Sequence, residues 1–374
     1  MRQKTIPTAA GKGPERVLLV SVVDRKEKRW RVIQSLEELA HLTATAGGVV
    51  VESLMQAMQR FNPATLLGIG KAHELAGISK QLNIDLVIFD TELTAAQIRN
   101  LEDLIGVRVI DRTTLILDIF SKHARTKEAK LQVELAQLEY RLPRLVGMGL
   151  EFSRLGGGIG TRGPGERKLE VDRRRIKERI ATLRRMLKKI EHSKEVQRKH
   201  RTGIPKVCVV GYTNAGKSSL VNALTRSHLV TSNQLFSTLD SNTKVLFVPP
   251  RFKVLLSDTV GFLKDLPHGL IASFHATLAE VMEADMLIHI VDATAEDLEE
   301  KIATVNSVLE ELNVAAKQAV LLFNKIDRLF DEEKIRIEAK YPGAMFVSAL
   351  KDIGLDSLRE DLRIRFFDQN RCTS

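Results

Sequence analysis

The chain has 374 residues, more than one ordinary hydrophobic core holds, so two or three domains are expected. Hydrophobic residues make up 44% and charged residues 28%, a balance typical of globular proteins and unlike that of disordered chains. Neither a membrane helix of ~20 apolar residues nor a secretory signal is visible, and two cysteines exclude a disulfide framework. These features predict a cytoplasmic protein.

The net charge of +10 is concentrated in one segment. Residues 151–201 carry 17 Lys and Arg against 7 Asp and Glu, and 17 − 7 = +10 equals the excess of the whole chain. Such a segment favours a polyanionic partner, because cationic side chains that bind phosphates release counterions. The alternative is a solvated helix face that only keeps the protein in solution.

The first 125 residues alternate short apolar runs with helical patterns. Strands are predicted at 16–23, 48–52, 85–89 and 107–110, a further short run at 65–68, and helices at 35–46, 71–82, 94–104 and 112–123. This alternation predicts a small N-terminal α/β domain with a mostly parallel sheet. The string Gly68-Ile69-Gly70-Lys71 lacks the spacing of a phosphate-binding loop and is interpreted as a turn.

Residues 126–202 have the pattern of two amphipathic helices. Two apolar series step by three and four residues, the second after one skipped position: Leu131, Leu135, Leu138, Leu142, Leu145, and Leu169, Ile176, Ile180, Leu183, Leu187, Ile190. Residues 147–165 between them are rich in glycine and predict a mobile loop, so the simplest arrangement is an antiparallel helical hairpin. Arg154 and Arg162 in the loop and Arg167 directly after it favour contact with RNA; the alternative is a hairpin tip without function.

The strongest signal for chemistry begins at an apolar strand predicted at 206–210. It is followed by Gly211, Tyr212, Thr213, Asn214, Ala215, Gly216, Lys217 and Ser218, and then by a helical pattern at 219–224. Strand, glycine loop and helix in this order form the context of a P-loop, whose backbone N–H groups face nucleotide phosphates. Lys217 is predicted to contact the β- and γ-phosphates, and the Ser218 hydroxyl to bind Mg²⁺.

Three further motifs follow, each after an apolar run. Residues 254–257 lead to Asp258, Thr259, Val260 and Gly261; residues 320–323 lead to Asn324, Lys325, Ile326 and Asp327; residues 345–347 lead to Ser348, Ala349 and Leu350. Asp258 is expected to hold a Mg²⁺-bound water, and the Gly261 N–H to contact the γ-phosphate. The Asp327 carboxylate accepts from both donors of guanine, which adenine lacks, and the Ser348 segment clamps the guanine carbonyl. Together these motifs predict a Mg²⁺-dependent GTPase domain at 203–374 with a Ras-like, mostly parallel sheet.

The segment between the P-loop and Asp258 should supply a threonine that senses Mg²⁺ and the γ-phosphate. The predicted segment is Phe236, Ser237, Thr238, Leu239 and Asp240, with Thr238 as the threonine. Thr231 and Thr243 are the alternatives.

Three other residues bear on hydrolysis. Many GTPases place a water-orienting Gln after the DxxG motif, but this chain has Phe262, which predicts slow intrinsic hydrolysis and a need for another group, ion or partner. Asn214 suggests a K⁺ site beside the phosphates, as in some potassium-stimulated GTPases; the alternative is that Asn suits the loop backbone. His268 is a weaker candidate for a base and is more simply a contact residue.

At this point the chain resembles the HflX family of translation-factor-class GTPases over nearly its whole length. The resemblance rests on residues 156–166 (GGGIGTRGPGE), 211–218 (GYTNAGKS), 236–240 (FSTLD), 258–262 (DTVGF) and 324–327 (NKID). It implies Thr238 as the switch threonine, an apolar residue at 262, and binding to the large ribosomal subunit with separation of stalled or idle ribosomes. Two departures are noted: Ser241-Asn242 replace a common Pro-Thr, and the chain ends soon after Leu350, where some relatives have a further domain.

The sequence therefore predicts three parts: an N-terminal α/β domain (1–125), a basic hairpin (126–202) that contacts ribosomal RNA, and a P-loop GTPase domain (203–374). We expect a monomer without membrane insertion. Two alternatives stay open: an RNA-binding regulatory module with GTP as a sensing ligand and negligible hydrolysis, or a GTPase that controls a membrane-associated partner and is peripheral at the membrane.

Overall fold

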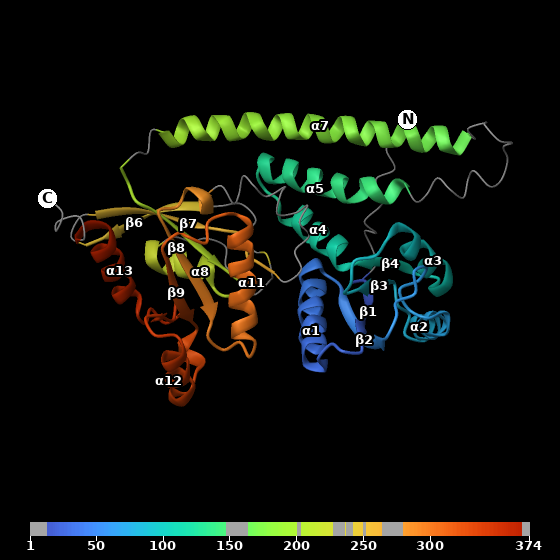
Figure 1. Cartoon of the computed structure of the whole chain (residues 1–374), viewed down its shortest axis with the longest axis horizontal. Coiled ribbons are helices and arrows are strands. Elements are labelled where there is room, and N and C mark those ends of the chain that lie inside the picture. Colours follow the sequence, from blue (N-terminus) through green and yellow to red (C-terminus); the bar gives the residue numbers. More distant parts are fainter. Residues whose placement is uncertain are drawn as a thin grey trace. The chain divides into compact units, whose positions relative to one another are not determined.

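The computed structural model describes residues 13–146, 164–199, 203–226, 236, 242–249, 252–263 and 280–368, with side chains of the long basic helix described for 170–193 (Figure 1). The chain divides into two compact units: Met1–Lys122 with Gln137–Ile180, and His123–Ala136 with Ala181–Ser374. This division falls within helices, and the three-part domain organisation stays a prediction.

The N-terminal unit contains a four-stranded sheet in which every strand is parallel to its neighbours. Its order is β2-β1-β3-β4, and its elements are β1 (Arg16–Asp24), α1 (Arg29–Ala46), β2 (Val49–Met58), α2 (Ile69–Gln81), β3 (Leu86–Phe89), α3 (Ala95–Ile105), β4 (Arg108–Asp111) and α4 (Arg112–His123). The predicted βα alternation and parallel sheet are confirmed. One face is packed against α2 and α3 through Leu18, Val20, Val87 and Phe89.

Several elements of this unit differ from the sequence-based prediction. Strand β2 continues six residues beyond position 52, to Met58, and α1 begins at Arg29 rather than at residue 35. The run at 65–68 forms no named strand; Leu66 makes only an isolated bridge with Asn62. The string at 68–71 is the start of a helix, because Gly68 is the N-cap of α2.

Helix α3 shows how local sequence sets a boundary. The Thr94 hydroxyl accepts from the Gln97 backbone N–H at 3.2 Å, and the Gln97 side chain accepts from the Thr94 N–H at 2.9 Å. This capping box satisfies donors that a helix start leaves unpaired. Gly106 ends the helix with φ +81, a left-handed conformation that glycine adopts without strain.

Helix α5 (Lys127–Val146) is tied to the N-terminal sheet by its last turns. Arg144 donates to Asp111 at 3.0 Å and to the Leu93 carbonyl at 2.7 Å, and its guanidinium stacks on the Tyr140 ring at 3.3 Å. The Tyr140 hydroxyl also donates to Asp111. Burial, together with the charge of Asp111, raises the pKa of Tyr140, so the hydroxyl remains a donor. We call this group the Asp111 clamp.

Helix α7 (Pro164–Lys199) is the basic helix predicted from the charge count. Pro164 is its first residue, a position where the missing N–H of proline costs nothing. Ile180 and Leu183, both from the predicted apolar series, are buried. The glycine-rich residues 147–163, with Arg154 and Arg162, lie outside the described residues.

The second unit contains a six-stranded sheet in the order β10-β9-β8-β5-β7-β6. Its elements are β5 (Lys206–Gly211), α8 (Lys217–Thr225), β6 (Asn242–Val248), β7 (Phe252–Asp258), β8 (Met286–Asp292), α11 (Leu298–Glu311), β9 (Ala319–Asn324), η1 (Ile326–Arg328), α12 (Asp331–Lys340), β10 (Met345–Phe346), α13 (Leu355–Arg363) and the π-helical turn η2 (Ile364–Asp368). All pairs are parallel except β6 with β7, which confirms the predicted mostly parallel sheet.

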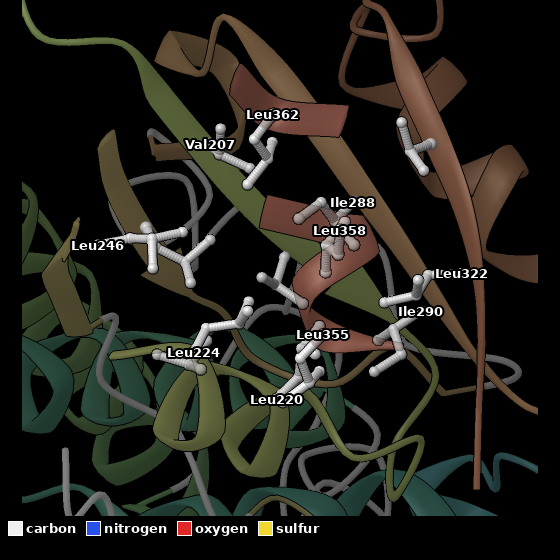
Figure 2. Close-up of a cluster of buried hydrophobic side chains, with 14 of the residues drawn as sticks. Val207, Leu220, Leu224, Leu246, Ile288, Ile290, Leu322, Leu355, Leu358 and Leu362 are labelled. Atoms are coloured by element: carbon white, nitrogen blue, oxygen red, sulfur yellow. The ribbon is translucent and has the colours of Figure 1, made fainter. Parts of the chain in front are cut away.

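One face of this sheet packs against α8 and α13. Figure 2 shows Leu220 and Leu224 of α8 and Leu355, Leu358 and Leu362 of α13 around strand residues such as Ile288 and Ile290. On the other face, Leu298 and Ile302 of α11 and Ile337 of α12 pack with Phe323. Because helices cover both faces, the strands read as continuous apolar runs, and the loops after their carboxyl ends hold the polar motifs.

Candidate nucleotide-binding site

The P-loop connects the end of β5 to the start of α8. Gly216 precedes the helix with φ +97, and a Cβ there would lie 2.2 Å from the Asn324 amide nitrogen. A side chain at 216 would therefore push apart the P-loop and the Asn324 segment. The loop backbone lies at the N-terminus of α8, where N–H groups are available to an anion.

Lys217 is the buried cation of this loop. Its side chain is 7% exposed, and its ammonium donates to the carbonyls of Gly211 at 3.2 Å and Tyr212 at 2.8 Å. Burial lowers the pKa of Lys217 to about 8; Asp258 opposes this effect and the positive charge of Lys325 adds to it. A phosphate bound next to Lys217 would stabilise the charged ammonium and so offset the cost of burying it.

Ser218 and Asp258 come together from different elements. The Ser218 hydroxyl, in the first turn of α8, donates to the carboxylate of Asp258, at the end of β7, at 2.6 Å. Asp258 is fully buried. A hydroxyl and a carboxylate are the hard oxygen donors that Mg²⁺ prefers, and their convergence beside the P-loop fits a Mg²⁺ ion shared with nucleotide phosphates.

The segment after Asp258 is bound to the P-loop through its backbone. The Phe262 N–H donates to the Gly211 carbonyl at 3.1 Å, and the Thr213 N–H donates to the Phe262 carbonyl at 2.8 Å. A Cβ at Gly261 would lie 2.7 Å from the Thr213 methyl and 3.0 Å from the Lys217 ammonium. The Phe262 ring is buried, so this residue serves the site through its main chain.

The guanine-selecting motif is assembled from three segments. The Asn324 amide donates to the Ala215 carbonyl at 2.9 Å, and its oxygen accepts from the Ala349 N–H at 3.0 Å. The Ser348 hydroxyl donates to the Asp327 carboxylate at 2.6 Å. Asn324 thus joins the P-loop to the last motif, while Ser348 orients the carboxylate expected to select guanine.

Lys325 makes a second connection between the P-loop and the guanine motif. Its ammonium donates to the Asn214 carbonyl at 2.8 Å and lies 2.6 Å from the Asp292 carboxylate. Asn214 itself has φ +60. Asp292 is the last residue of the buried strand β8. The sequence analysis did not select it, although an acid at the carboxyl end of a buried strand is a signal that could have indicated it.

The structure brings most of the predicted residues to one edge of the sheet. The members described there belong to three groups: Gly211, Tyr212, Thr213, Asn214, Ala215, Gly216, Lys217 and Ser218; Asp258, Thr259, Val260 and Gly261; Asn324, Lys325, Ile326, Asp327, Ser348, Ala349 and Leu350. Phe236 is buried, and the Leu350 side chain is 75% exposed. Ser237, Thr238, Leu239, Asp240, Thr231, Ser241 and His268 lie outside the described residues.

Thr243, the other candidate for the switch threonine, takes part in a different contact. Its hydroxyl lies 3.0 Å from the Ser257 hydroxyl and donates to Glu280 at 3.1 Å. It belongs to β6, the antiparallel edge strand that the sequence did not predict. Ser257 and Glu280 were also not selected, because their partners are distant in sequence.

Three family models match successive parts of the chain. They are described as the GTP-binding GTPase N-terminal region (residues 33–121), the GTP-binding GTPase middle region (123–201) and the 50S ribosome-binding GTPase (206–325). The protein "GTPase HflX" of Caldanaerobacter subterraneus subsp. tengcongensis is 46% identical over 362 residues, which cover 96% of this chain and 82% of that protein. The chain belongs to the GTPase HflX family.

Other relatives agree with this assignment. The HflX protein of Escherichia coli K12 is 41% identical over 355 residues, covering 94% of this chain and 83% of that protein. Among solved structures, that of SsGBP in complex with GDP matches with a TM-score of 0.51 and 26% identity, covering 95% of this chain and 99% of that one. This HflX-family chain is thus a GTP-binding protein and a GTPase, as predicted.

One further observation concerns membranes. In the part of the chain that the structure describes, none of the helices combines the length and the apolar character needed to cross a bilayer.

Proposed function

We propose that this GTPase binds the large ribosomal subunit through its basic helix α7 and that nucleotide state controls this binding, so that stalled or idle ribosomes are separated. The family model described as a 50S ribosome-binding GTPase supports the partner. The observation that carries the proposal is the charge on α7. A cytoplasmic location and a monomeric state follow as part of the proposal.

The exposed surface of α7 is predominantly basic. Its exposed cationic side chains are Arg173, Arg174, Arg175, Lys177, Arg179, Arg184, Arg185, Lys188 and Lys189. Ile180 and Leu183 are buried, so apolar and basic positions are separated around the helix. The ion pair of Arg174 with Glu178 spans 3.9 Å and is exposed on both sides, which makes it weak and leaves the cation able to contact phosphates.

The nucleotide is proposed to bind along the P-loop edge. Lys217 would bind the β- and γ-phosphates, the Gly261 N–H the γ-phosphate, and Asp327 the guanine base. Ser218, Thr238 and, through water, Asp258 would hold Mg²⁺, which when bound neutralises phosphate charge. The contact of 2.6 Å between Ser218 and Asp258 supports the roles of these two residues at the Mg²⁺ site.

Hydrolysis is proposed to depend on a partner. The buried Phe262 ring offers no hydrogen bond to an attacking water, and its backbone is already engaged by the P-loop. The large subunit would then supply or order the missing group. Asn214 is proposed as a K⁺ ligand beside the phosphates, and equal hydrolysis rates in KCl and NaCl would remove that role.

Sedimentation with purified large subunits tests the proposal. More protein should sediment with subunits in the presence of a non-hydrolysable GTP analogue than with GDP, and subunits should accelerate phosphate release. Sedimentation that ignores the nucleotide would contradict the ribosomal role. Binding without accelerated phosphate release would favour an RNA-binding module that only senses GTP.

A further inference from the structure

The ammonium of Lys325 lies between two partners from different elements. It donates to the Asn214 carbonyl of the P-loop at 2.8 Å and lies 2.6 Å from the carboxylate of Asp292, the last residue of β8. The Lys325 and Asp292 side chains are only 20% and 22% exposed, so water screens this pair less than the surface pairs of α7. The contact is therefore a charge-assisted bridge at the edge of the nucleotide site.

Asp292 is oriented independently of Lys325. One of its oxygens accepts from the Thr294 N–H at 3.1 Å and from the Thr294 hydroxyl at 2.7 Å. The next residue, Ala293, donates its N–H to the Asn324 carbonyl at 2.9 Å. The turn after β8 thus fixes one carboxylate oxygen and leaves the other directed to the lysine, as in an Asx-turn.

The backbone of Lys325 explains why a second anchor is useful. Lys325 has φ +66, a left-handed conformation that is uncommon for a residue with a side chain and persists where surrounding contacts hold it. Asp327 follows two residues later, so the conformation at 325 determines where its carboxylate lies. Ser348 holds that carboxylate from the other side at 2.6 Å.

We infer that Asp292 is a positioning residue for guanine nucleotides: it holds Lys325 against the P-loop at Asn214, so that the phosphate-binding and base-selecting segments form one preorganised edge. Asp292 acts through Lys325 and touches no nucleotide. The inference rests on the proposed placement of the nucleotide at this edge. We expect Asp292 to affect nucleotide binding and not hydrolysis, because its bridge to Lys325 lies between the P-loop and the guanine-selecting motif, away from the Ser218–Asp258 contact.

Nucleotide affinity measured by calorimetry or fluorescence tests the inference. Asp292→Asn should weaken GDP and GTP to a similar degree, on the order of tenfold, because a charge-assisted contact becomes a neutral one. The hydrolysis rate at saturating GTP should stay within about twofold, since uniform binding changes KM and leaves kcat. Thr294→Val keeps the charges of Asp292 and Lys325 but removes a hydroxyl that donates to Asp292. It should weaken GDP binding by a smaller factor than Asp292→Asn does.

The deciding comparison is a double-mutant cycle with Lys325→Gln. In that background Asp292→Asn should cause no further loss of GDP affinity, because its route of action is gone. Asp361→Asn is the matched control: its pair with Arg365 is also 2.6 Å long and similarly exposed (24% and 29%), but lies on α13 and η2, and GDP affinity should not change.

The outcomes separate this inference from the proposed site. Wild-type protein that binds no GDP would overturn the proposed nucleotide placement itself. Two other outcomes would overturn only the positioning role. One is a wild type that binds GDP while Asp292→Asn and Thr294→Val both bind it with unchanged affinity. The other is a loss of GDP affinity from Asp292→Asn that is as large in the Lys325→Gln background as in the wild type. Thr294→Val keeps the test decisive if Asp292→Asn does not fold.

Discussion

At the scale of single residues, His289 is the buried group whose titration has a clear consequence. It lies in β8, in register with Val210 of β5, and is 5% exposed. Burial, with a contribution from the charge of Lys217, lowers the pKa of His289 to about 4 from 6.5. Between these values the unfolded chain binds a proton that the folded chain does not, so stability present above pH 6.5 is lost as the pH falls toward 4.

His289→Leu should remove this acid sensitivity. From pH 7 to pH 5, protonation linked to His289 should lower the free energy of unfolding of the wild type by about 2 kcal/mol. The variant lacks this contribution, so its total loss over the same pH range should be smaller by the same amount. Chemical denaturation at both pH values measures the difference. His73→Gln changes an exposed histidine and serves as the control, which should behave as the wild type. If His289→Leu lost as much unfolding free energy between pH 7 and pH 5 as the wild type, His289 would not be the source of the acid sensitivity.

Residue-level prediction from sequence succeeded where function is encoded locally. The spacing from Gly211 to Ser218 fixes one loop between one strand and one helix, so the fold around Lys217 could be anticipated. Asp292 could not be paired with Lys325, because 33 residues separate them and only the parallel order of β8 and β9 brings them together. The position of Thr238 stays a prediction, since it lies outside the described residues.

At the scale of elements, the Asp111 clamp connects α5 to the N-terminal sheet. Arg144 compensates a carboxylate that is fully buried, so its removal leaves that charge with only neutral donors. The clamp joins the sheet to the residues directly before the glycine-rich segment. Its expected role is to make the last turns of α5 part of the N-terminal unit.

Arg144→Met should loosen those turns. We expect faster hydrogen exchange across residues 137–146 and a loss of roughly 2 kcal/mol in stability, because a buried charged hydrogen bond is broken. Adding Asp111→Asn should restore part of the loss by removing the uncompensated charge. Arg141→Met, on the exposed side of the same helix, is the control; equal exchange in both single variants would count against the clamp.

Elements were predictable where burial shapes their composition. The apolar runs of β5, β8 and β9 arise because helices cover both faces, and the same cause makes them visible in the sequence. Strand β6 is an edge strand in which Leu246 and Val248 are buried while Val245 and Phe247 are exposed. Its apolar run at 245–248 was missed because it is only four residues long and follows a polar start at 242–244. The outer half of β2, which also lies at a sheet edge, was missed because Glu52, Ser53 and Gln56 interrupt its apolar residues.

At the scale of the whole molecule, net charge determines which partners are attracted. The excess of +10 lies in residues 151–201, and the charges of the remaining residues sum to zero. Electrostatic attraction to RNA should therefore act through α7 and be steeply salt-dependent. The composition predicted a polyanionic partner, but only the family assignment points to the ribosome, because charge alone does not distinguish one polyanion from another.

Replacing two cations of α7 measures this contribution. With Lys188→Gln and Lys189→Gln combined, affinity for the large subunit should fall, and the slope of log affinity against log salt should decrease by roughly 1.5, at 0.7 to 0.9 per lost phosphate contact. Lys334→Gln with Arg336→Gln, two cations of α12, is the control and should leave the slope unchanged. An identical slope in both double variants would place RNA contact elsewhere.

The two carbonyls that accept from Lys217 have a consequence for nucleotide binding. The Gly211 and Tyr212 carbonyls accept from the Lys217 ammonium, so a phosphate bound as proposed would compete with these two carbonyls for that donor. Its net gain is the difference between the two sets of bonds. A nucleotide bound as proposed would therefore gain less from this lysine than from one whose ammonium had no acceptors within the protein.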